Sequence, residues 1–461
     1  MKKNFVIKSR RDVPAVEIVT SDKVISKASA DLARPLTVEI IRAVVKRIKS
    51  EIAQKSTEIT YETFRKEIIR EIKLVSKKRI SRIINGTGIL VHTNLGRAPL
   101  SKSLFENIKE NVTGYGNLEF NVASGKRGKR GELAEKYLSL LSCAEAGAIV
   151  NNNAASLFLI LNTLANRRKV VISRGELVQI GGGFRIPDLI KKSGARLLEI
   201  GTTNITELKD YEEAMEQNPA LILKVHRSNF AIEGFTGEAD IKSLVRLGKK
   251  YNVPVVNDLG SGVFINTSEF IKTKEPTVPE SVRSGANLTC FSGDKLLGGL
   301  QAGLIVGSKE LVSKIKRNPV YRAMRVDKVV FSAMEVLLQY YLDGSWKENI
   351  KLWRLAAVDK TELNKRGQKI LKNLSAGDKI KLEPSEGQMG GGSLPEVCLP
   401  SVGLVFESKL APQKIAALFR GADSPVIGRI KDDQFIIDLK AIDIDDIDQL
   451  LSTIKSIIPK L

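Results

Sequence analysis

Lys295 has the surroundings of a lysine that could act as a nucleophile. It lies in the segment Leu288–Gly303, just after an apolar run and before a Gly-rich reversal into a second apolar run. Burial there would lower the pKa of the ammonium group and leave the neutral amine, which forms an imine with an aldehyde cofactor. Ser292 could donate a hydrogen bond to a phosphate oxygen. The backbone is expected to pass close to a ligand at three glycines, Gly298, Gly299 and Gly303. By itself, however, the segment is more typical of a Gly-rich turn with an exposed lysine.

An aspartate at the end of another apolar run supports the cofactor chemistry. Asp258 follows the run Val253–Asn257, 37 residues before Lys295, and precedes a loop that contains two glycines. A carboxylate there could keep the pyridine nitrogen of pyridoxal phosphate protonated, which makes that ring an electron sink. The alternative is that Asp258 only forms a turn or caps a helix. Because Asp258 and Lys295 both follow apolar runs, together they favour pyridoxal phosphate as the cofactor.

Small residues and amides at the junction Ile149–Ser156 are suited to binding the phosphate. A strand is expected to pass there into an apolar helix, and a helix N-terminus binds phosphate through its unpaired N–H groups and its dipole. The residues predicted to hold the cofactor phosphate are Asn152, Asn153, Ala154 and Ala155. Asn153 could instead be a plain N-cap. The segment Arg174–Gly183 is expected to pass near the cofactor ring. His226, at another strand end, either touches the cofactor or is a buried histidine with its own partners.

The elements that must position these residues follow from the same pattern. From about residue 82, short β-branched runs alternate with Gly-rich turns and helical stretches. The runs predicted to be strands cover residues 170–173, 221–226, 253–259, 288–291 and 304–306. This alternation predicts an α/β domain whose sheet is mostly parallel and covered on both faces. Ligands of such sheets gather at the carboxyl ends of the strands, where Lys295 and Asp258 are expected to lie.

Three domains are predicted along the chain. Residues 1–80 form a small basic helical domain, and residues 81–335 form the large cofactor-binding domain. Residues 336–461 form a small C-terminal α/β domain together with the helix that links it to the large domain. The linking helical stretch runs from Lys328 to about Leu374, and the Gly-rich segment Gly387–Ser393 lies within the C-terminal domain.

The first 80 residues contain two amphipathic helical patterns. The first has Val38, Ile41, Val45, Ile48 and Ile52 inside, with Arg42, Lys46 and Lys49 outside. The second has Tyr61, Phe64, Ile68, Ile72 and Val75 inside, with Arg65, Lys66, Arg70, Lys73 and Lys77 outside. These 80 residues carry +10 of the net charge of +21, which favours a phosphate-backbone partner over a merely solvated surface. Because aromatic residues are not interleaved with the charges, the predicted partner is a folded RNA, not a single strand or DNA.

Several classes of protein are excluded by composition. No apolar run approaches the roughly 18 residues that a membrane span needs, and no signal peptide is present, so a cytoplasmic protein is expected. Cys143, Cys290 and Cys398 lie far apart, so neither a disulfide framework nor a cysteine metal site is predicted. With His92 and His226 as its two histidines, the chain is not expected to hold a zinc or di-iron centre.

Long, ordered blocks of the chain resemble the bacterial selenocysteine synthase family. They are Ile84–Ser101, Gly125–Gly128, Val150–Ala154, Ser173–Leu177, Gly201–Asn204, Asn257–Gly262, Ser292–Gly299 and Pro425–Ile430. The resemblance implies the aspartate-aminotransferase-like fold of fold-type I pyridoxal-phosphate enzymes. It also implies a homodecamer that converts the seryl group of seryl-tRNA(Sec) into selenocysteinyl-tRNA(Sec), with selenophosphate as the selenium donor. Residues 33–44 resemble the family's tRNA-binding N-terminal domain, whereas residues 1–30 match it loosely.

The resemblance also assigns roles to individual residues. It places the cofactor lysine at Lys295, a catalytic aspartate at Asp294, and active-site arginines at Arg97, Arg322 and Arg325. Guanidinium groups suit a tetrahedral oxyanion such as selenophosphate. Arg322 and Arg325 are three residues apart, so they share a face if the stretch is helical. Without the resemblance, all three arginines would more often be surface or ion-pair residues.

These assignments suggest a mechanism. The seryl amine displaces Lys295 from the cofactor, and Lys295 then removes the α-proton while Asp258 keeps the ring cationic. Loss of the β-hydroxyl, protonated by Asp294 or Lys295, leaves a dehydroalanyl-tRNA. Selenium then adds from selenophosphate that the arginines hold.

The sequence is also compatible with two other functions. One is a pyridoxal-phosphate lyase or transferase that acts on a small-molecule amino acid, which has no need of the basic N-terminal domain. The other is a non-catalytic RNA-binding scaffold that has kept the fold, which would bind no cofactor. The pairing of Lys295 with Asp258 argues against the scaffold.

Overall fold

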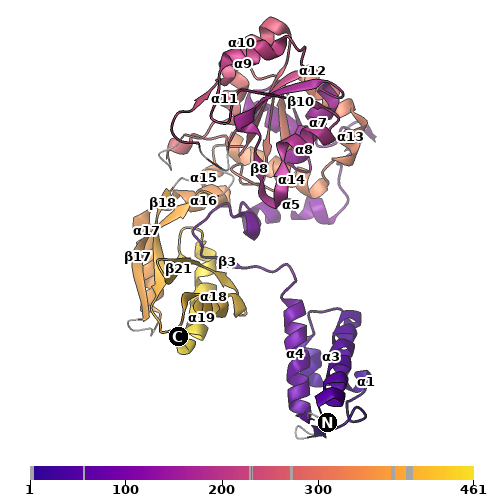
Figure 1. Cartoon of the computed structure of the whole chain (residues 1–461), viewed down its shortest axis with the longest axis vertical. Helices are drawn as coiled ribbons and strands as arrows, with labels where there is room; N and C mark the ends of the chain where they lie inside the picture. The colour runs from indigo at the N-terminus through magenta and orange to yellow at the C-terminus, as the bar shows by residue number, and fades with distance from the viewer. Residues whose placement is uncertain are drawn as a thin grey trace. The chain divides into compact units, whose positions relative to one another are not determined.

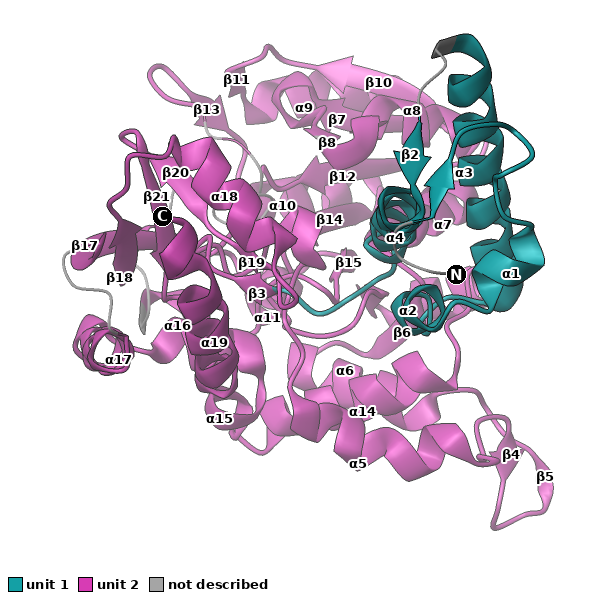
Figure 2. Cartoon of the chain, turned by 90° about the horizontal axis from the view of Figure 1, so that it is seen from below, with its two compact units in different colours: residues 1–83 teal, residues 84–461 magenta. Residues whose placement is uncertain are grey.

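The chain folds into two compact units. The computed structural model describes residues 5–55, 58–227, 230, 232–269, 274–374, 379–390 and 398–461. Unit 1 comprises Met1–Ile83 and unit 2 comprises Ile84–Leu461 (Figure 2). Each unit has a hydrophobic core of its own.

Unit 1 is a bundle of four helices. They are α1 (Val16–Thr20), α2 (Lys23–Ala28), α3 (Arg34–Lys55) and α4 (Tyr61–Ser76), and β1 (Val6–Ile7) pairs with β2 (Ile59–Thr60). The two amphipathic patterns of the sequence are α3 and α4, which confirms both helices. Their apolar faces pack together around Ile41, Ile48, Phe64 and Ile68 (Figure 1).

Arg65 departs from the predicted pattern in unit 1. Its side chain is 13% exposed and forms ion pairs with Asp22 and Glu62. Asp22 also caps α2 and accepts a hydrogen bond from the hydroxyl of Tyr61 at 2.9 Å. The prediction that Arg65 is an outer residue of its helix is therefore wrong, because the partly buried carboxylate of Asp22, the N-cap of α2, binds it.

Unit 2 is built on a seven-stranded sheet. In spatial order, its strands are β10 (Arg196–Ile200), β7 (Lys169–Ser173), β12 (Leu221–Val225), β14 (Val255–Gly260), β15 (Leu288–Ser292), β16 (Gly303–Gly307) and β6 (Ala146–Val150). Neighbouring strands from β10 to β15 are parallel, and β16 is antiparallel to both β15 and β6. All five predicted strand runs are present, and the mostly parallel sheet is confirmed.

Alternating side chains along the strands bury both faces of the sheet. Val170 and Ile172 of β7 pack toward α7 (Asn153–Leu164) and α8 (Ile186–Lys192). Val171, between them, packs toward α9 (Leu208–Met215) and α10 (Ile241–Tyr251) on the opposite face (Figure 1). This arrangement follows from the two-residue repeat of a strand and from the apolar composition of these runs.

The C-terminal part of unit 2 is a second, smaller α/β layer. The helical stretch that leads to it consists of α14 (Lys328–Leu342), α15 (Trp346–Asn349), α16 (Lys351–Ala357) and α17 (Lys360–Lys372). The antiparallel sheet has the order β17 (Ile380–Gln388), β18 (Cys398–Phe406), β21 (Gln434–Asp438) and β20 (Arg429–Lys431). It packs against α17, α18 (Pro412–Gly421) and α19 (Ile447–Ile457). Of the predicted Gly-rich segment 387–393, residues 391–393 lie outside the described residues.

The segment after Ile83 joins this smaller layer to the edge of the large sheet. β3 (Ile84–Asn85) pairs in parallel with β19 (Val426–Ile427). The N–H groups of Leu90 and Val91 then donate to the carbonyls of Gln388 and Met389 at 2.9 and 2.7 Å. Arg97 follows at the end of this segment, so its position is fixed by backbone pairing with the C-terminal layer.

Candidate active site

A cavity of about 310 Å³ lies at the carboxyl edge of the large sheet. Its lining comes from the ends of β12, β14 and β15, from the start of α7 and from three connecting segments, which contain Arg97, Val178 and Lys295. The lining residues are Arg97, Asn152, Asn153, Ala154, Leu157, Val178, Gly181, Phe184, Ile186, Val225, His226, Asp258, Gly260, Ser292, Lys295 and Gln301. A larger hollow of about 580 Å³, around Tyr115 and Phe331, contains none of the predicted site residues.

Lys295 and Asp258 both face this cavity. Lys295 lies in the turn between β15 and β16, where burial lowers the pKa of its ammonium group although the carboxylate of Asp258 opposes the shift. Asp258 is 6% exposed, and burial raises the pKa of its carboxyl group. Asn153 Nδ2 donates to Asp258 Oδ1 at 2.8 Å, and the N–H of Gly260 donates to the same oxygen at 3.1 Å. Asp258 therefore accepts a hydrogen bond within its own turn, as the alternative interpretation predicts. It also faces the cavity.

The start of α7 has the form of a phosphate site. Asn152 is the N-cap, and its Oδ1 accepts from the N–H of Ala155 at 2.9 Å. The suggestion that Asn153 is the N-cap is therefore wrong, because its amide binds Asp258 instead. The N–H groups of Asn153 and Ala154 belong to the first helical turn and have no acceptor within the helix. Ala155, whose N–H is already bound by the cap, does not line the cavity.

The predicted role of three glycines needs correction. A Cβ at Gly303 would overlap the carbonyl oxygen of Asn152 and the hydroxyl of Ser156. Gly298 lies against Ile350 in the same way, and Gly299 lies against Leu337. These glycines admit neighbouring protein atoms, not a ligand, and Gly303 lets β16 approach the first turn of α7.

Arg97 and Asp294 form an ion pair beside Lys295. Arg97 Nη1 donates to Asp294 Oδ2 at 2.6 Å, and the N–H of Ala98 donates to the carbonyl of Asp294 at 3.1 Å. Arg97 has a left-handed backbone with φ of 66°, and its N–H donates to the carbonyl of His92 at 2.9 Å. The Arg97 side chain is 38% exposed, whereas that of Asp294 is 8% exposed. The pair thus extends from the buried turn of Lys295 to solvent.

Arg322 and Arg325 do not line the cavity. Helix α13 spans Pro319–Ala323, so Arg325 lies beyond its end and the two arginines do not share a helical face. Arg322 is exposed, and Arg325 lies 5.9 Å from the ring centroid of Tyr321. The carbonyl of Met324, between them, accepts from the N–H of Asn151 at 3.0 Å, which joins this segment to the end of β6.

His226 and the loop after β7 form further walls of the cavity. His226 Nε2 lies 3.2 Å from Glu275 Oε1, and the N–H of His226 donates to the carbonyl of Asp258 at 2.8 Å. The loop Arg174–Gly183 contributes Val178 and Gly181, as expected for a segment near the ring. Phe184 and Ile186 also line the cavity but lie beyond the predicted segment.

Glu176 and Glu275 are site-supporting residues that the sequence did not reveal. Glu176 accepts from Lys224 Nζ and from the N–H of Val225, both at 2.8 Å, which ties the loop after β7 to the end of β12. Glu176 is the acidic residue of the motif Ser173–Leu177, so the sequence did contain a signal for it. Glu275 follows no apolar run and belongs to no motif, so no signal marked it.

The residues at the cavity fit pyridoxal phosphate. The cavity offers an amine for an aldehyde at Lys295, a buried carboxylate for a ring nitrogen at Asp258, and a helix N-terminus for a phosphate. Val178 and Val225 offer apolar walls for a ring. Asn153 Oδ1, beside Asp258, is a buried acceptor without a hydrogen-bond partner in the described part of the chain. In that part, no cluster of three or more His, Cys, Asp or Glu side chains could hold a metal ion, and no helix is long and apolar enough to cross a membrane.

Known proteins resemble this chain in both sequence and fold. The family model described as SelA, L-seryl-tRNA selenium transferase, matches residues 83–443. The L-seryl-tRNA(Sec) selenium transferase of Aquifex aeolicus is 44% identical, over 91% of this chain and 94% of its own length. That of Geotalea daltonii is 40% identical, over 97% of this chain and 99% of its own length.

A solved structure with the same fold is that of D-glucosaminate-6-phosphate ammonia-lyase. It matches with a TM-score of 0.60 at 18% identity, and it covers 84% of this chain and 98% of its own. The fold is that of the fold-type I pyridoxal-phosphate enzymes, as expected from the sequence. With its cofactor-type cavity and relatives at 40% identity or more over nearly its whole length, the chain belongs to the L-seryl-tRNA selenium transferase family.

Proposed function

We propose that this chain converts seryl-tRNA(Sec) into selenocysteinyl-tRNA(Sec), with pyridoxal phosphate as its cofactor. The observation that carries the proposal is one cavity that combines Lys295, Asp258 and the start of α7, with the Arg97–Asp294 pair beside it. The family membership of the chain names the substrate class. Because that substrate is an aminoacyl-tRNA, we place the reaction in the cytoplasm.

Each group in the cavity has a separate task in this reaction. Bound pyridoxal phosphate supplies an electron sink for the α-carbon of the seryl group. The amine of Lys295, whose pKa is lowered by burial, removes and returns the α-proton. Asp258 holds a proton on the ring nitrogen by its negative charge. The ammonium of Lys295, which has taken the α-proton, donates a proton to the departing β-hydroxyl, while the carboxylate of Asp294 holds Arg97 beside it.

The selenium donor is proposed to be selenophosphate. Arg97 is the arginine that lines the cavity, and its fork of N–H groups suits a tetrahedral oxyanion. Its ion pair with Asp294 positions it next to Lys295, where the β-carbon chemistry is proposed to take place. Arg322 and Arg325, which the family resemblance also assigns to selenophosphate, lie outside this cavity. The homodecamer that the family resemblance implies is checked by the mass of the protein in solution.

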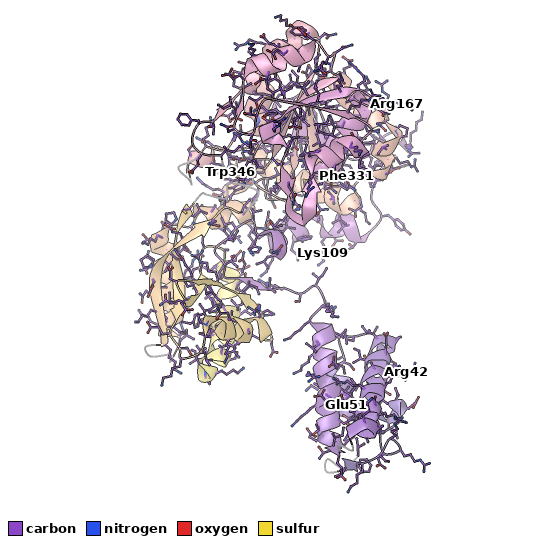
Figure 3. All side chains as sticks on the ribbon, viewed as in Figure 1. Arg42, Glu51, Lys109, Arg167, Phe331 and Trp346 are labelled. Carbon is purple, nitrogen blue, oxygen red and sulfur yellow. The ribbon has the colours of Figure 1, made fainter. Side chains whose placement is uncertain are left out.

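Unit 1 is proposed to bind the phosphate backbone of the tRNA. A groove of about 480 Å³ runs along α3 and is lined by four cationic side chains, Arg10, Arg42, Lys46 and Lys49. In Figure 3, Arg42 lies on the side of α3 that faces away from α4. No carboxylate in the described part of unit 1 forms an ion pair with these four residues. On α4, by contrast, Arg70 is paired with Glu67 and Glu71. The groove along α3 therefore has the uncompensated charge that attracts phosphate.

The test of this function is selenium transfer to purified seryl-tRNA. The wild-type protein should transfer selenium, and Lys295→Ala should abolish both transfer and the visible band of the cofactor. Arg42→Ala and Lys46→Ala should weaken tRNA binding and each reduce the salt dependence by about one unit of slope. Arg70→Ala, with its charge already neutralised, serves as the matched control. An unchanged salt dependence in all three variants would contradict the groove.

A small-molecule substrate is the second candidate function. Its support is that this chain shares its fold with the ammonia-lyase. That likeness concerns the fold and does not identify a substrate. Removal of residues 1–83 distinguishes the two functions. The tRNA enzyme should lose substrate binding, whereas an enzyme for a free amino acid should keep its turnover.

A further inference from the structure

Glu176 lies where two strands of the large sheet diverge. β12 pairs with β7 at Leu221 and Ile222, so Val225, three residues further along β12, lies beyond that pairing. One oxygen of the Glu176 carboxylate accepts from the N–H of Val225 at 2.8 Å. The side chain of Glu176 thus takes the place of a strand partner at the carboxyl edge of the sheet, where the ligands of parallel sheets bind.

The backbone of Glu176 holds a second wall of the cavity. Its carbonyl accepts from the N–H of Val178 at 2.9 Å, and the carbonyl of Val178 accepts from the N–H of Ile186 at 3.2 Å. Val178, Ile186 and Val225 all line the cavity. Glu176 therefore connects the wall formed by the loop after β7 to the wall formed by the end of β12.

The charge of Glu176 is balanced inside the protein. Its other carboxylate oxygen accepts from Lys224 Nζ at 2.8 Å, and Lys224 also contacts Glu238 at 3.2 Å. Glu238 in turn forms an ion pair with Arg227 at 3.3 Å. Burial, together with the charge of Glu176, raises the pKa of the Tyr211 hydroxyl. Because Lys224 has two carboxylate partners, it keeps one of them when Glu176 is replaced.

The walls of a ring-binding cavity must stay close to the ring to contribute to binding. The dispersion attraction between an apolar side chain and a ring falls steeply once a gap opens between them. The Glu176 side chain is 3% exposed, so its hydrogen bonds are shielded from competing water. Such bonds can hold the two walls at a fixed separation, as a binding site that is formed in advance requires.

We propose that Glu176 is a positioning residue for the cofactor, which holds Val178 and Val225 against the ring of bound pyridoxal phosphate. Glu176 acts through these two residues and does not itself line the cavity. The inference rests on the proposed cofactor but does not depend on the proposed tRNA substrate. It gives a task to the acidic residue of the motif Ser173–Leu177, which the proposed reaction does not use.

The test uses the full-length protein and reads the bound cofactor directly. Glu176→Met removes the acceptor of the Val225 N–H and leaves Lys224 paired with Glu238. We expect pyridoxal phosphate to bind about tenfold more weakly, because a hydrogen bond to a charged group is lost. We also expect the visible circular dichroism of each bound cofactor to fall, since that signal requires a ring held in one orientation.

Glu238→Met is the matched control. It removes the other carboxylate at Lys224, but Glu238 is 55% exposed and does not line the cavity. We expect this variant to keep the cofactor affinity and the dichroism of the wild type.

Glu176→Gln separates the hydrogen bond from the charge. Its amide oxygen can still accept from the N–H of Val225, so this variant should keep most of the cofactor affinity and dichroism. If Glu176→Met does not fold, Glu176→Asp makes the same comparison. Its shorter side chain draws the carboxylate away from Val225 while the charge remains, so it should weaken cofactor binding more than Glu176→Gln does.

Three outcomes would overturn the inference. They are wild-type affinity and dichroism in Glu176→Met, equal losses in Glu238→Met, and a Glu176→Gln variant that is as impaired as Glu176→Met or Glu176→Asp. A wild-type protein that binds no pyridoxal phosphate would instead overturn the proposed cofactor. Cofactor binding as expected with no selenium transfer to seryl-tRNA would overturn the proposed substrate and leave the inference standing.

Discussion

Lys440 shows how a single charged residue connects the C-terminal layer to the helices that lead into it. Its side chain is buried, and Nζ donates to the carbonyls of Ala356 and Val358 at 3.0 and 2.6 Å. These carbonyls lie at the end of α16, where backbone acceptors lack helical partners. Lys440 therefore acts as a C-terminal cap from a distant part of the chain.

Burial lowers the pKa of Lys440 from 10.5 to about 8, which makes the stability of unit 2 depend on pH. Between these two pKa values, the unfolded chain binds more protons than the folded chain, so the free energy of unfolding rises with pH. Below about pH 8 the ammonium is charged in both states and this dependence ends. Relative to Lys440→Met, the wild type should gain roughly 1 to 3 kcal/mol as the pH rises through this window.

Urea unfolding of the two proteins at several pH values measures this gain. Lys431→Met, at an exposed position of β20, is the control and should show no comparable gain. A difference between wild type and Lys440→Met that stays constant with pH would contradict the low pKa of Lys440.

At the residue scale, the sequence is most informative where a residue follows a strong apolar run. Asp258 and Lys295 were predicted in this way, and both line one cavity, while their roles at the cofactor stay predictions. The contacts of Glu275 and of Asn152, the observed N-cap of α7, depend on which side chain points toward which neighbour. The spacing of residues in the sequence does not carry that information. The condition for Arg322 and Arg325 to share a helical face is not met, because α13 ends at Ala323.

At the scale of elements, the contact between β16 and α7 sets the geometry of the proposed phosphate site. Gly303 allows the first turn of α7 to lie directly against β16, and a side chain there would overlap the carbonyl of Asn152. Gly303 has no left-handed backbone, so the requirement for glycine is purely steric. The position of the α7 N-terminus therefore depends on this close approach.

Gly303→Ala should displace the first turn of α7. We expect a loss of about 1 to 3 kcal/mol in stability from overpacking, together with weaker binding of pyridoxal phosphate. Gly237→Ala is the control, because the nearest atom to its added Cβ is Ile205 Cγ2 at an ordinary 3.5 Å. Thermal unfolding and cofactor titration of the two variants provide the measurement. Wild-type cofactor affinity in Gly303→Ala would contradict the proposed role of this contact.

The sheet was predicted in most of its strands but not in all of them. The five apolar runs became strands because both of their faces are buried, which leaves a continuous apolar signal. The edge strand β10 was missed because most of its side chains are partly or fully exposed, so its sequence Arg196–Ile200 is mixed. The antiparallel direction of β16 agrees with the predicted reversal after Lys295, since the short connection leaves no room for a crossover helix.

At the scale of the whole molecule, the two units have separate cores. The cluster around Phe64 draws its buried residues only from unit 1, between Ile7 and Ile72. The clusters around the large sheet draw theirs only from unit 2. Each unit should therefore unfold in a transition of its own.

Phe64→Ala tests this independence. Phe64 is fully buried, and its truncation should cost about 3 to 5 kcal/mol, which is comparable with the stability of a domain of this size. We expect calorimetry to show the loss of the unit 1 transition and an unchanged unit 2 transition, with the visible cofactor band intact. Leu74→Ala, at a half-exposed position of α4, should preserve both transitions. A shift of the unit 2 transition in Phe64→Ala would show that the units are coupled.

The place of β6 in the sheet has a consequence for the synthesis of the protein. β6 ends the strand order, and its neighbour β16 begins at Gly303, far later in the chain than Val150. At roughly 5 to 20 residues per second, a ribosome needs about 8 to 30 seconds to make the intervening residues. During that time β6 has no neighbouring strand to pair with. The N-terminus of α7, which follows β6, also lacks the strand β16 that packs against it in the folded protein. The newly made chain thus becomes able to hold its cofactor late in translation, when the turn of Lys295 and β16 emerge together.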